Sequence, residues 1–338
     1  MARPSPLQRY KLRIRRKRLL LRAHQSRKAL TNLRDRTAQI KENDILLFAT
    51  MRNESLRLPN FLEHYRNLGV NHFLIVDNGS EDESLAFLEA QPDVSVWLTF
   101  DSYKASRFGM DWLTWLLRRY GHGHWTVTVD ADELLIYPDH TSRKLPELTA
   151  WLDRTGQPMM GALMLDLYPK GPADTQEYYA GDDPCEVLQW FDAYGYWAQR
   201  QPKMEALWLQ GGPRARRFFG ADPRRAPTLN KTPLIKWHRS YTYVSSTHSA
   251  LPTRLNRIYD ESGVEKVSGV LLHTKFLPDA GARARQEQQR KEHFSNSSLY
   301  DEYYAAMARN PDLWTPESLR LSGWQQLLRL GLMSRGGW

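Results

Sequence analysis

Two clusters of acidic and amide side chains in the first half of the chain have the composition of a cation site. Asp130 and Asp132 are separated by one residue, and Asp77 is followed by Asn78. Residues i and i+2 of an extended segment share a face, so both aspartates of the first cluster can approach one ion. Mn²⁺ and Mg²⁺ prefer oxygen ligands and are bound by one or two carboxylates together with substrate phosphates. The pair therefore predicts Mn²⁺ or Mg²⁺ as a cofactor.

Both clusters follow apolar segments that are typical of buried strands. The predicted strands are residues 44–51, 71–76, 94–100 and 125–129. Apolar residues at helical spacing lie between them, at residues 58–68, 84–90 and 108–120. Strands alternating with helices indicate βαβ units and a mostly parallel sheet. In such sheets ligands bind outside the carboxyl ends of the strands, where both acidic clusters are expected.

The second half of the chain has a less regular pattern. We predict short strands at 161–167 and 271–276, and long loops at 168–185 and 210–233. A polar helical segment is expected at 281–310, followed by a short amphipathic helix at 324–333.

The net charge of +9 is concentrated at the N-terminus. Residues 1–36 hold 13 of the 47 basic residues and one of the 38 acids, and the remainder is slightly acidic. Apolar residues recur among the arginines at near-helical spacing, which favours a basic amphipathic helix on an anionic membrane surface. A solvated, partly disordered arm and an organelle transit peptide are the alternatives. Nucleic acid is not an expected partner, because the body lacks a second basic patch.

The single cysteine and the hydropathy bear on the compartment. Cys185 has no partner for an intrachain disulfide, which fits a reducing compartment. No apolar run approaches the ~18 residues that a membrane span needs. The expected location is cytoplasmic, with peripheral attachment at the inner face of the membrane through residues 1–36.

Four sequence blocks in this order resemble one known family. They are ATMRNESLRLPNFLEHYRNLGV, HFLIVDNGSEDES, SYKASRFGMDWL and WTVTVDADELLIYP. They look like the nucleotide-sugar half of glycosyltransferase family 2 proteins, in the branch that carries R-N-E, V-D-N-G-S and D-A-D-E. The resemblance covers roughly residues 44–140. It implies a GT-A-like α/β fold, with a mostly parallel Rossmann-like sheet flanked by helices and an irregular C-terminal acceptor region.

The resemblance also implies a division of the chain. Residues 1–40 would be a basic arm, partly helical or disordered. Residues 41–280 would be the glycosyltransferase domain, and residues 281–338 a C-terminal helical tail. Within the domain, 41–140 would bind the nucleotide-sugar and 141–280 the acceptor.

Site residues follow from the same resemblance. The residues expected to bind the nucleotide-sugar are Arg52, Asn53, Glu54, Asp77, Asn78, Lys104, Arg107 and Asp130. Asp132 would bind the metal, with Asp130 beside it and a C-terminal histidine as a third ligand. Of the three candidate histidines, His273 is favoured over His248 and His238 because it ends an apolar run.

The implied activity is metal-dependent transfer of a sugar from a nucleotide-sugar to a saccharide or lipid-linked acceptor, with inversion. Inverting transfer needs a carboxylate base, and the candidates are Asp166, Asp192 and Glu205. Arg214, Arg216 and Arg217 would either clamp a diphosphate or form a solvated loop. The alternatives are a nucleotide-sugar-binding scaffold without catalysis and a nucleotidyltransferase. The latter would usually have a glycine-rich loop where this chain reads MRNES.

Overall fold

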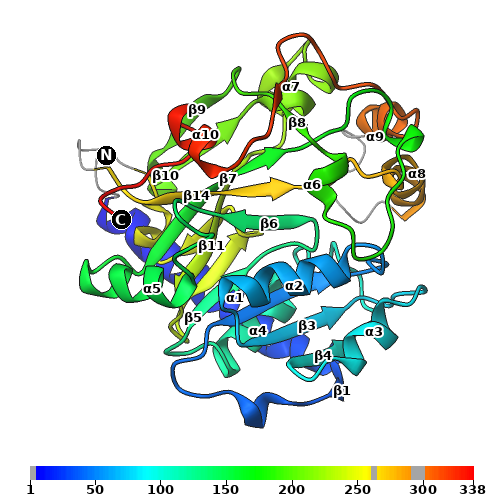
Figure 1. Ribbon diagram of the computed structural model, residues 1–338. Coiled ribbons are helices and arrows are strands. Elements are labelled where there is room, and N and C mark those ends of the chain that lie inside the picture. The colour runs from blue at the N-terminus through cyan, green and yellow to red at the C-terminus, as the bar shows by residue number, and fades with distance from the viewer. Residues whose placement is uncertain (1–4, 260–264, 291–300) are drawn as a thin grey trace.

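The centre of the molecule is a nine-stranded sheet (Figure 1), in a computed structural model that describes residues 5–259, 265–290 and 301–338. The strand order is β1-β4-β3-β2-β5-β11-β7-β14-β6. Their bounds are β1 Thr31–Arg34, β2 Leu46–Met51, β3 His72–Asp77, β4 Val94–Leu98, β5 Trp125–Thr128, β6 Glu133–Ile136, β7 Met159–Asp166, β11 Asn230–Lys236 and β14 Ser268–His273. Strands β4, β3, β2, β5, β7 and β14 run in one direction, and β1, β11 and β6 run in the other. The prediction of an α/β protein with a mostly parallel central sheet is confirmed.

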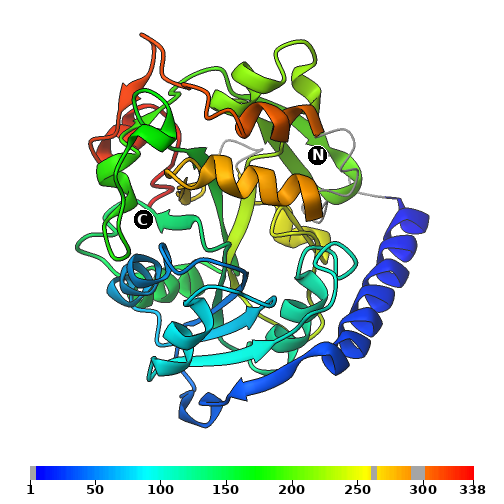
Figure 2. The same cartoon turned by 90° about the vertical axis from the view of Figure 1, so that its right-hand side faces the viewer.

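Helices cover both faces of this sheet (Figures 1 and 2). Their bounds are α1 Pro6–Ser26, α2 Leu58–Leu68, α3 Ser84–Ala90, α4 Met110–Arg119, α5 Leu145–Arg154, α6 Pro184–Val187, α7 Gly212–Phe218, α8 Ala280–Arg290, α9 Asp301–Met307 and α10 Trp324–Arg329. Three smaller strand pairs lie outside the central sheet. They are β9 Trp197–Gln201 with β10 Ala206–Gln210, β12 Thr242–Ser245 with β13 Ser249–Leu251, and β8 Trp190–Phe191 with β15 Leu319–Arg320.

Alternating residues of β2 explain why it lies in the middle of the sheet. Leu47 and Ala49 pack into the larger core, with α2 and α5. Leu46 and Phe48 point to the opposite face and pack with α4. Successive side chains of a strand point to opposite faces, so a continuous apolar run is the pattern of a strand that is buried on both sides.

The N-terminal region is part of the fold. The predicted basic helix forms, and Ser5 is its N-cap. The Ser5 hydroxyl accepts a hydrogen bond from the backbone N–H of Gln8, and the side-chain oxygen of Gln8 accepts one from the backbone N–H of Ser5. Its buried residues Leu12 and Leu19 pack against Leu251. The strand β1, which was not predicted, pairs antiparallel with β4 and forms an edge of the central sheet. The region is therefore held at two places.

The predicted loop at 210–233 is wrong in two places. It contains the helix α7, and its last residues begin β11, which lies between β5 and β7. Pro233 argues against a central strand because it has no N–H to donate. The pairing of β11 with β7 is irregular between Lys231 and Leu234. This register shift accommodates the proline.

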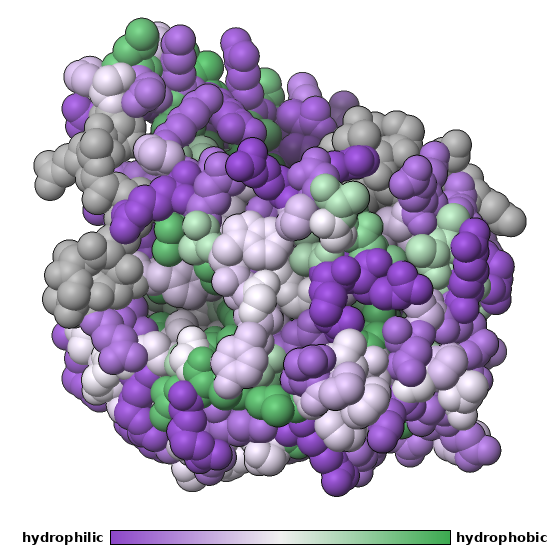
Figure 3. Space-filling model, turned by 90° about the horizontal axis from the view of Figure 1, so that it is seen from above, coloured by the Kyte–Doolittle hydropathy of each residue, from purple (hydrophilic) through white to green (hydrophobic). Residues whose placement is uncertain are grey.

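The C-terminal residues pack on the body. Trp324 and Leu327 of α10, and Trp338, belong to the larger core. The predicted helical segment 281–310 includes residues 291–300, which lie outside the described part of the chain, while α8 and α9 lie on either side of them. Among the residues that the structure describes, no helix combines the length and hydropathy needed to cross a bilayer. The face seen in Figure 3 is mostly hydrophilic, with apolar residues in small patches.

Candidate active site

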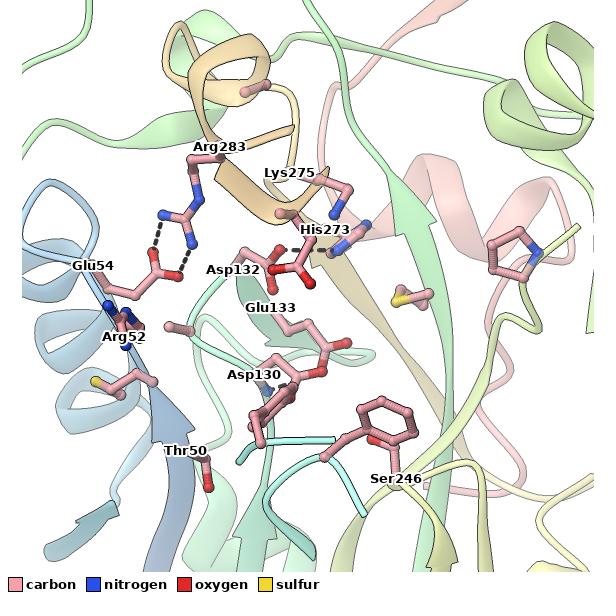
Figure 4. Close-up of a pocket in the computed structure, with 18 of the residues that line it drawn as sticks. Thr50, Arg52, Glu54, Asp130, Asp132, Glu133, Ser246, His273, Lys275 and Arg283 are labelled. Carbon is pink, nitrogen blue, oxygen red and sulfur yellow. Dashed lines mark hydrogen bonds and ion pairs between the residues drawn. The ribbon is translucent and has the colours of Figure 1, made fainter. Parts of the chain in front are cut away.

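The carboxyl ends of the parallel strands surround a cavity of about 440 Å³. Asp130 and Asp132 follow β5, and His273 ends β14. Because β6 and β11 run in the opposite direction, they begin at the same edge with Glu133 and Lys231. All five residues line the cavity. Figure 4 shows the three acids at its centre, with Glu54 and Arg283 on one side and His273 and Lys275 above.

Lys231 neutralises the first aspartate of the D-A-D-E segment. Its Nζ lies 2.9 Å from Oδ2 of Asp130 and 2.8 Å from Oε1 of Glu133. The side chain of Asp130 is 41% exposed, whereas those of Lys231 and Glu133 are buried. Burial raises the pKa of Glu133 to about 7, although Lys231 opposes this shift. Glu133 also accepts a hydrogen bond from the backbone N–H of Asp130 and so braces the turn.

His273 connects the second aspartate to a buried carboxylate. Its Nε2 lies 3.1 Å from Oδ2 of Asp132, and its Nδ1 lies 2.6 Å from Oδ1 of Asp166. Arg214 donates from Nε to the other oxygen of Asp166, at 2.7 Å. Burial disfavours the imidazolium, but the two carboxylates outweigh it and raise the pKa of His273. Burial alone would raise the pKa of Asp132, but His273 and nearby cations hold it well below its usual range.

These side chains fit a divalent cation of the predicted kind. Asp130 and Asp132 offer hard oxygen ligands at the cavity. A histidine that binds a metal usually donates its other ring N–H to a carboxylate, and Asp166 is in that position for His273. Over the described residues, no group of three or more His, Cys, Asp and Glu side chains is arranged to hold a metal by itself. A cation held by Asp130 and Asp132 would therefore need ligands beyond these side chains.

His248, the alternative ligand, also lines the cavity. Its Nδ1 lies 2.7 Å from the carbonyl oxygen of Asn230. Burial lowers the pKa of His248 to about 3, and the charge of Lys231 adds to the shift. His248 is therefore neutral. The third candidate, His238, interacts with Ser240 and does not line the cavity.

A second ionic cluster forms the opposite wall. Glu54 follows β2 and is paired with Arg57 and with Arg283 of α8. Asp279 binds Arg57 at 3.0 Å and lies 3.6 Å from Arg283. Figure 4 shows Glu54 and Arg283 pointing toward each other. The cluster fixes the R-N-E segment to the C-terminal half of the chain.

Asp77 does not line the cavity, although it ends β3. Its two carboxylate oxygens accept hydrogen bonds from the backbone N–H and the hydroxyl of Ser80. Gly79 has a φ of +69°, and a Cβ there would come within 2.9 Å of Phe100. Asp77 therefore shapes the turn, while Asn78 reaches the cavity wall. The prediction that Asp77 contacts the nucleotide is not supported by its position.

The other residues predicted to bind the nucleotide-sugar do not all reach the cavity. Arg52 and Glu54 line the cavity. The side-chain oxygen of Asn53 accepts a hydrogen bond from the N–H of Glu81, outside the lining. Arg107 is paired with Asp111 and holds the carbonyl of Tyr243. Neither Arg107 nor Lys104 lines the cavity, so their positions do not support the prediction that they contact a nucleotide-sugar.

The three predicted catalytic bases, Asp166, Asp192 and Glu205, also lie outside the cavity lining. Asp192 interacts with Tyr168 and Arg216, and Glu205 with Thr253 and Arg257. Neither lines the cavity. Asp166 is adjacent to it but is enclosed, with both oxygens occupied by His273 and Arg214. The positions of the three therefore do not support the prediction that one of them is the base.

Sequence reasoning missed several cations of the site. Lys231, Lys275, Arg57 and Arg283 all line the cavity. Lys231 could have been noticed because it is the only charged residue in NKTPLI. Pro233, however, argued against a strand at this position. Of the arginines predicted at 214–217, Arg214 lines the cavity, whereas Arg217 is exposed. Burial lowers the pKa of Lys275, with Asp132 opposing the shift.

None of the protein-family models matches the chain, and the search of curated proteins finds no similar sequence.

Proposed function

We propose that the chain is a metal-dependent glycosyltransferase of the GT-A type, which transfers a sugar from a nucleotide-sugar to a saccharide or lipid-linked acceptor. One observation carries the proposal. Asp130 and Asp132 line one cavity at the carboxyl edge of a mostly parallel sheet, among several buried cations. Ligands of α/β sheets bind at this edge.

The proposed metal ligands are Asp130 and Asp132, and His273 would become the third only after its Nε2 leaves Asp132. A bound Mn²⁺ or Mg²⁺ would neutralise charge on the leaving diphosphate. Asp166 would hold the Nδ1 proton of His273, and Arg214 would keep Asp166 ionised. These buried partners fix the orientation of the imidazole before any ligand binds.

The cations of the cavity suit an anionic donor. Arg52, Arg214 and Lys275 lie around the acids and can be approached from the cavity. Arginine binds phosphate oxygens through a planar pair of donors, and lysine binds them as a point charge. The proton acceptor of an inverting transfer is expected among carboxylates that line the cavity, such as Glu287 of α8.

A donor screen tests the proposal. Purified protein with Mn²⁺ would be incubated with UDP-, GDP- and dTDP-sugars, and release of the nucleotide would be measured. We expect turnover with one of them, and a loss of at least about 100-fold in the Asp132→Asn variant. Asp153→Asn is the control, because Asp153 also pairs with a basic side chain but lies on α5, outside the cavity. Equal turnover by Asp132→Asn and wild type would show that the metal assignment is wrong.

A nucleotide-sugar-binding scaffold is the second candidate. It is favoured by the engagement of both aspartates with cations of the protein itself, Lys231 and His273. Calorimetry would distinguish the two candidates. Binding of a nucleotide-sugar without turnover, unaffected by Mn²⁺, would favour the scaffold.

A further inference from the structure

The outward face of α1 carries an apolar stripe that the fold does not cover. Leu7, Tyr10 and Leu21 are 62%, 61% and 57% exposed. At about 100° per residue they fall within an arc of about 60° around the helix axis. Ile14 lies within the same arc and is partly exposed. The buried residues Leu12 and Ala23 lie on nearly the opposite side, so the stripe points away from the body.

Exposed basic residues border this stripe on both sides. Lys11 and Arg18 lie on one side of it, and Arg13 and Lys17 lie on the other, by the same helical geometry. All four are exposed. The sequence of α1 contains no acidic residue. The outward face is therefore apolar along its middle and positively charged along its edges.

Contacts with the body fix the orientation of this face. Arg22 donates to Oδ2 of Asp111 on α4, at 2.8 Å, and to the carbonyl of Ala105. Arg118 of α4 donates to the carbonyl of Leu20. In Figure 2, α1 runs along the outer edge of the molecule as the dark blue helix. Another surface can therefore reach the stripe along the length of α1 without any change in the fold.

We propose that the outward face of α1 binds the surface of an anionic lipid bilayer. Helices that lie in a bilayer interface combine apolar residues, which enter the boundary of the acyl chains, with basic residues that meet anionic headgroups. Nucleic acid would use the basic residues but would leave the apolar stripe in water. The proposal depends on α1 alone and does not require the chain to be a glycosyltransferase.

Vesicle co-sedimentation tests the charge of this face. The full chain would be mixed with vesicles of phosphatidylcholine, with or without about a third phosphatidylglycerol. We expect binding only to the anionic vesicles and weaker binding as salt is added. A variant with Lys11, Arg13, Lys17 and Arg18 changed to Gln should bind at least about tenfold more weakly. The matched control changes four exposed bases elsewhere to Gln, namely Lys41, Arg154, Lys203 and Arg309.

A second pair of variants tests the stripe. Tyr10→Ser should weaken binding to anionic vesicles about threefold or more. Tyr194→Ser removes a tyrosine that is 70% exposed elsewhere and should leave binding unchanged. Thermal unfolding would check that all variants are folded.

Three results would overturn the proposal. They are equal losses in the α1 variants and their controls, no binding of wild type to anionic vesicles, and displacement from vesicles by a short DNA duplex at equal charge concentration. Salt-sensitive dimers in the absence of vesicles, abolished by the four changes in α1, would assign the face to a second copy of the chain.

Discussion

The cavity and the outward face of α1 both concentrate charge, but they do so in opposite ways. In the cavity, Lys231, His273 and Arg214 each contact a carboxylate within 3.1 Å, and all three are buried. On α1, bases such as Lys11 and Arg18 are exposed, on a helix without an acidic residue. These three cations of the cavity are paired before any ligand arrives, whereas the bases of the helix face have no acid on their own helix.

This difference determines which property a substitution in each region should change. Buried ions must be paired, because an unpaired charge in the interior loses its hydration. The pairs of the cavity are therefore needed for the fold as well as for any chemistry. Exposed basic residues change the free energy of unfolding little, and they remain available to a partner. Substitutions should therefore affect stability in the cavity and affinity on α1.

The largest expected effect is the loss of a carboxylate behind the cavity. Asp166→Ala leaves Arg214 and His273 facing each other without the anion between them, and the side chains of Asp166 and Arg214 are only 1% and 6% exposed. Removal of one partner from such a buried pair costs about 3–5 kcal/mol. Urea denaturation would measure the change in the free energy of unfolding.

The control for this variant is an exposed ion pair. Arg143 and Glu147 lie 3.8 Å apart on the surface, with exposed fractions of 38% and 57%. Glu147→Ala should change the free energy of unfolding by less than ~1 kcal/mol. Similar losses in both variants would contradict the distinction between buried and exposed charge.

The sequence predicts the half of the fold in which local patterns and tertiary structure agree. The helix Leu58–Leu68 matches its predicted bounds, because Pro59 suits a first turn and Gly69 ends the helix with a φ of +97°. The strand at 71–76 is found as β3, shifted by one residue. For these two elements, the order of apolar and polar residues was enough.

The second half and the site depend on contacts that no local pattern contains. Lys231 meets Asp130 across 101 residues of sequence, and His273 meets Asp166 across 107. The strand β6 was missed because its apolar run directly follows the acidic cluster. The acidic motif indicated where the cavity is. Two cations of the cavity, Lys231 and His273, come from strands that are distant in sequence. Asp77 was expected in the cavity for another reason, because the motif does not reveal that Ser80, three residues away, occupies its oxygens.

Acidic pH should lower the free energy of unfolding by a smaller amount. His64 belongs to α2, its Nε2 lies 2.9 Å from the carbonyl of Leu135 on β6, and burial lowers its pKa to about 4. The unfolded chain then binds a proton that the folded chain does not, so this contribution to stability is lost as the pH falls from about 6.5 toward 4. Between pH 7 and pH 4.5 the loss from this residue is about 2 kcal/mol.

His64→Gln isolates that contribution, because an amide can still donate to the Leu135 carbonyl without titrating. Its free energy of unfolding should fall less steeply with acid than that of wild type, as measured by urea denaturation at several pH values. Vesicle binding should not change over the same range if the protein stays folded, because Lys and Arg keep their charge there. Parallel pH profiles for wild type and variant would exclude His64 as the titrating group.

The smallest expected effect is at the contact that joins α1 to α4. Arg22 on α1 is half exposed, while its partner Asp111 is buried and also binds Arg107, which holds the carbonyl of Tyr243. In the Arg22→Gln variant, Asp111 keeps Arg107, so no buried charge is left alone. The free energy of unfolding should therefore fall by less than ~1 kcal/mol. Asp111→Asn leaves the mostly buried Arg107 without its carboxylate and should cost more. If Arg22→Gln costs as much as Asp111→Asn in the same urea titration, α1 stabilises the fold as much as the buried ion pairs do, and the distinction between the two regions fails.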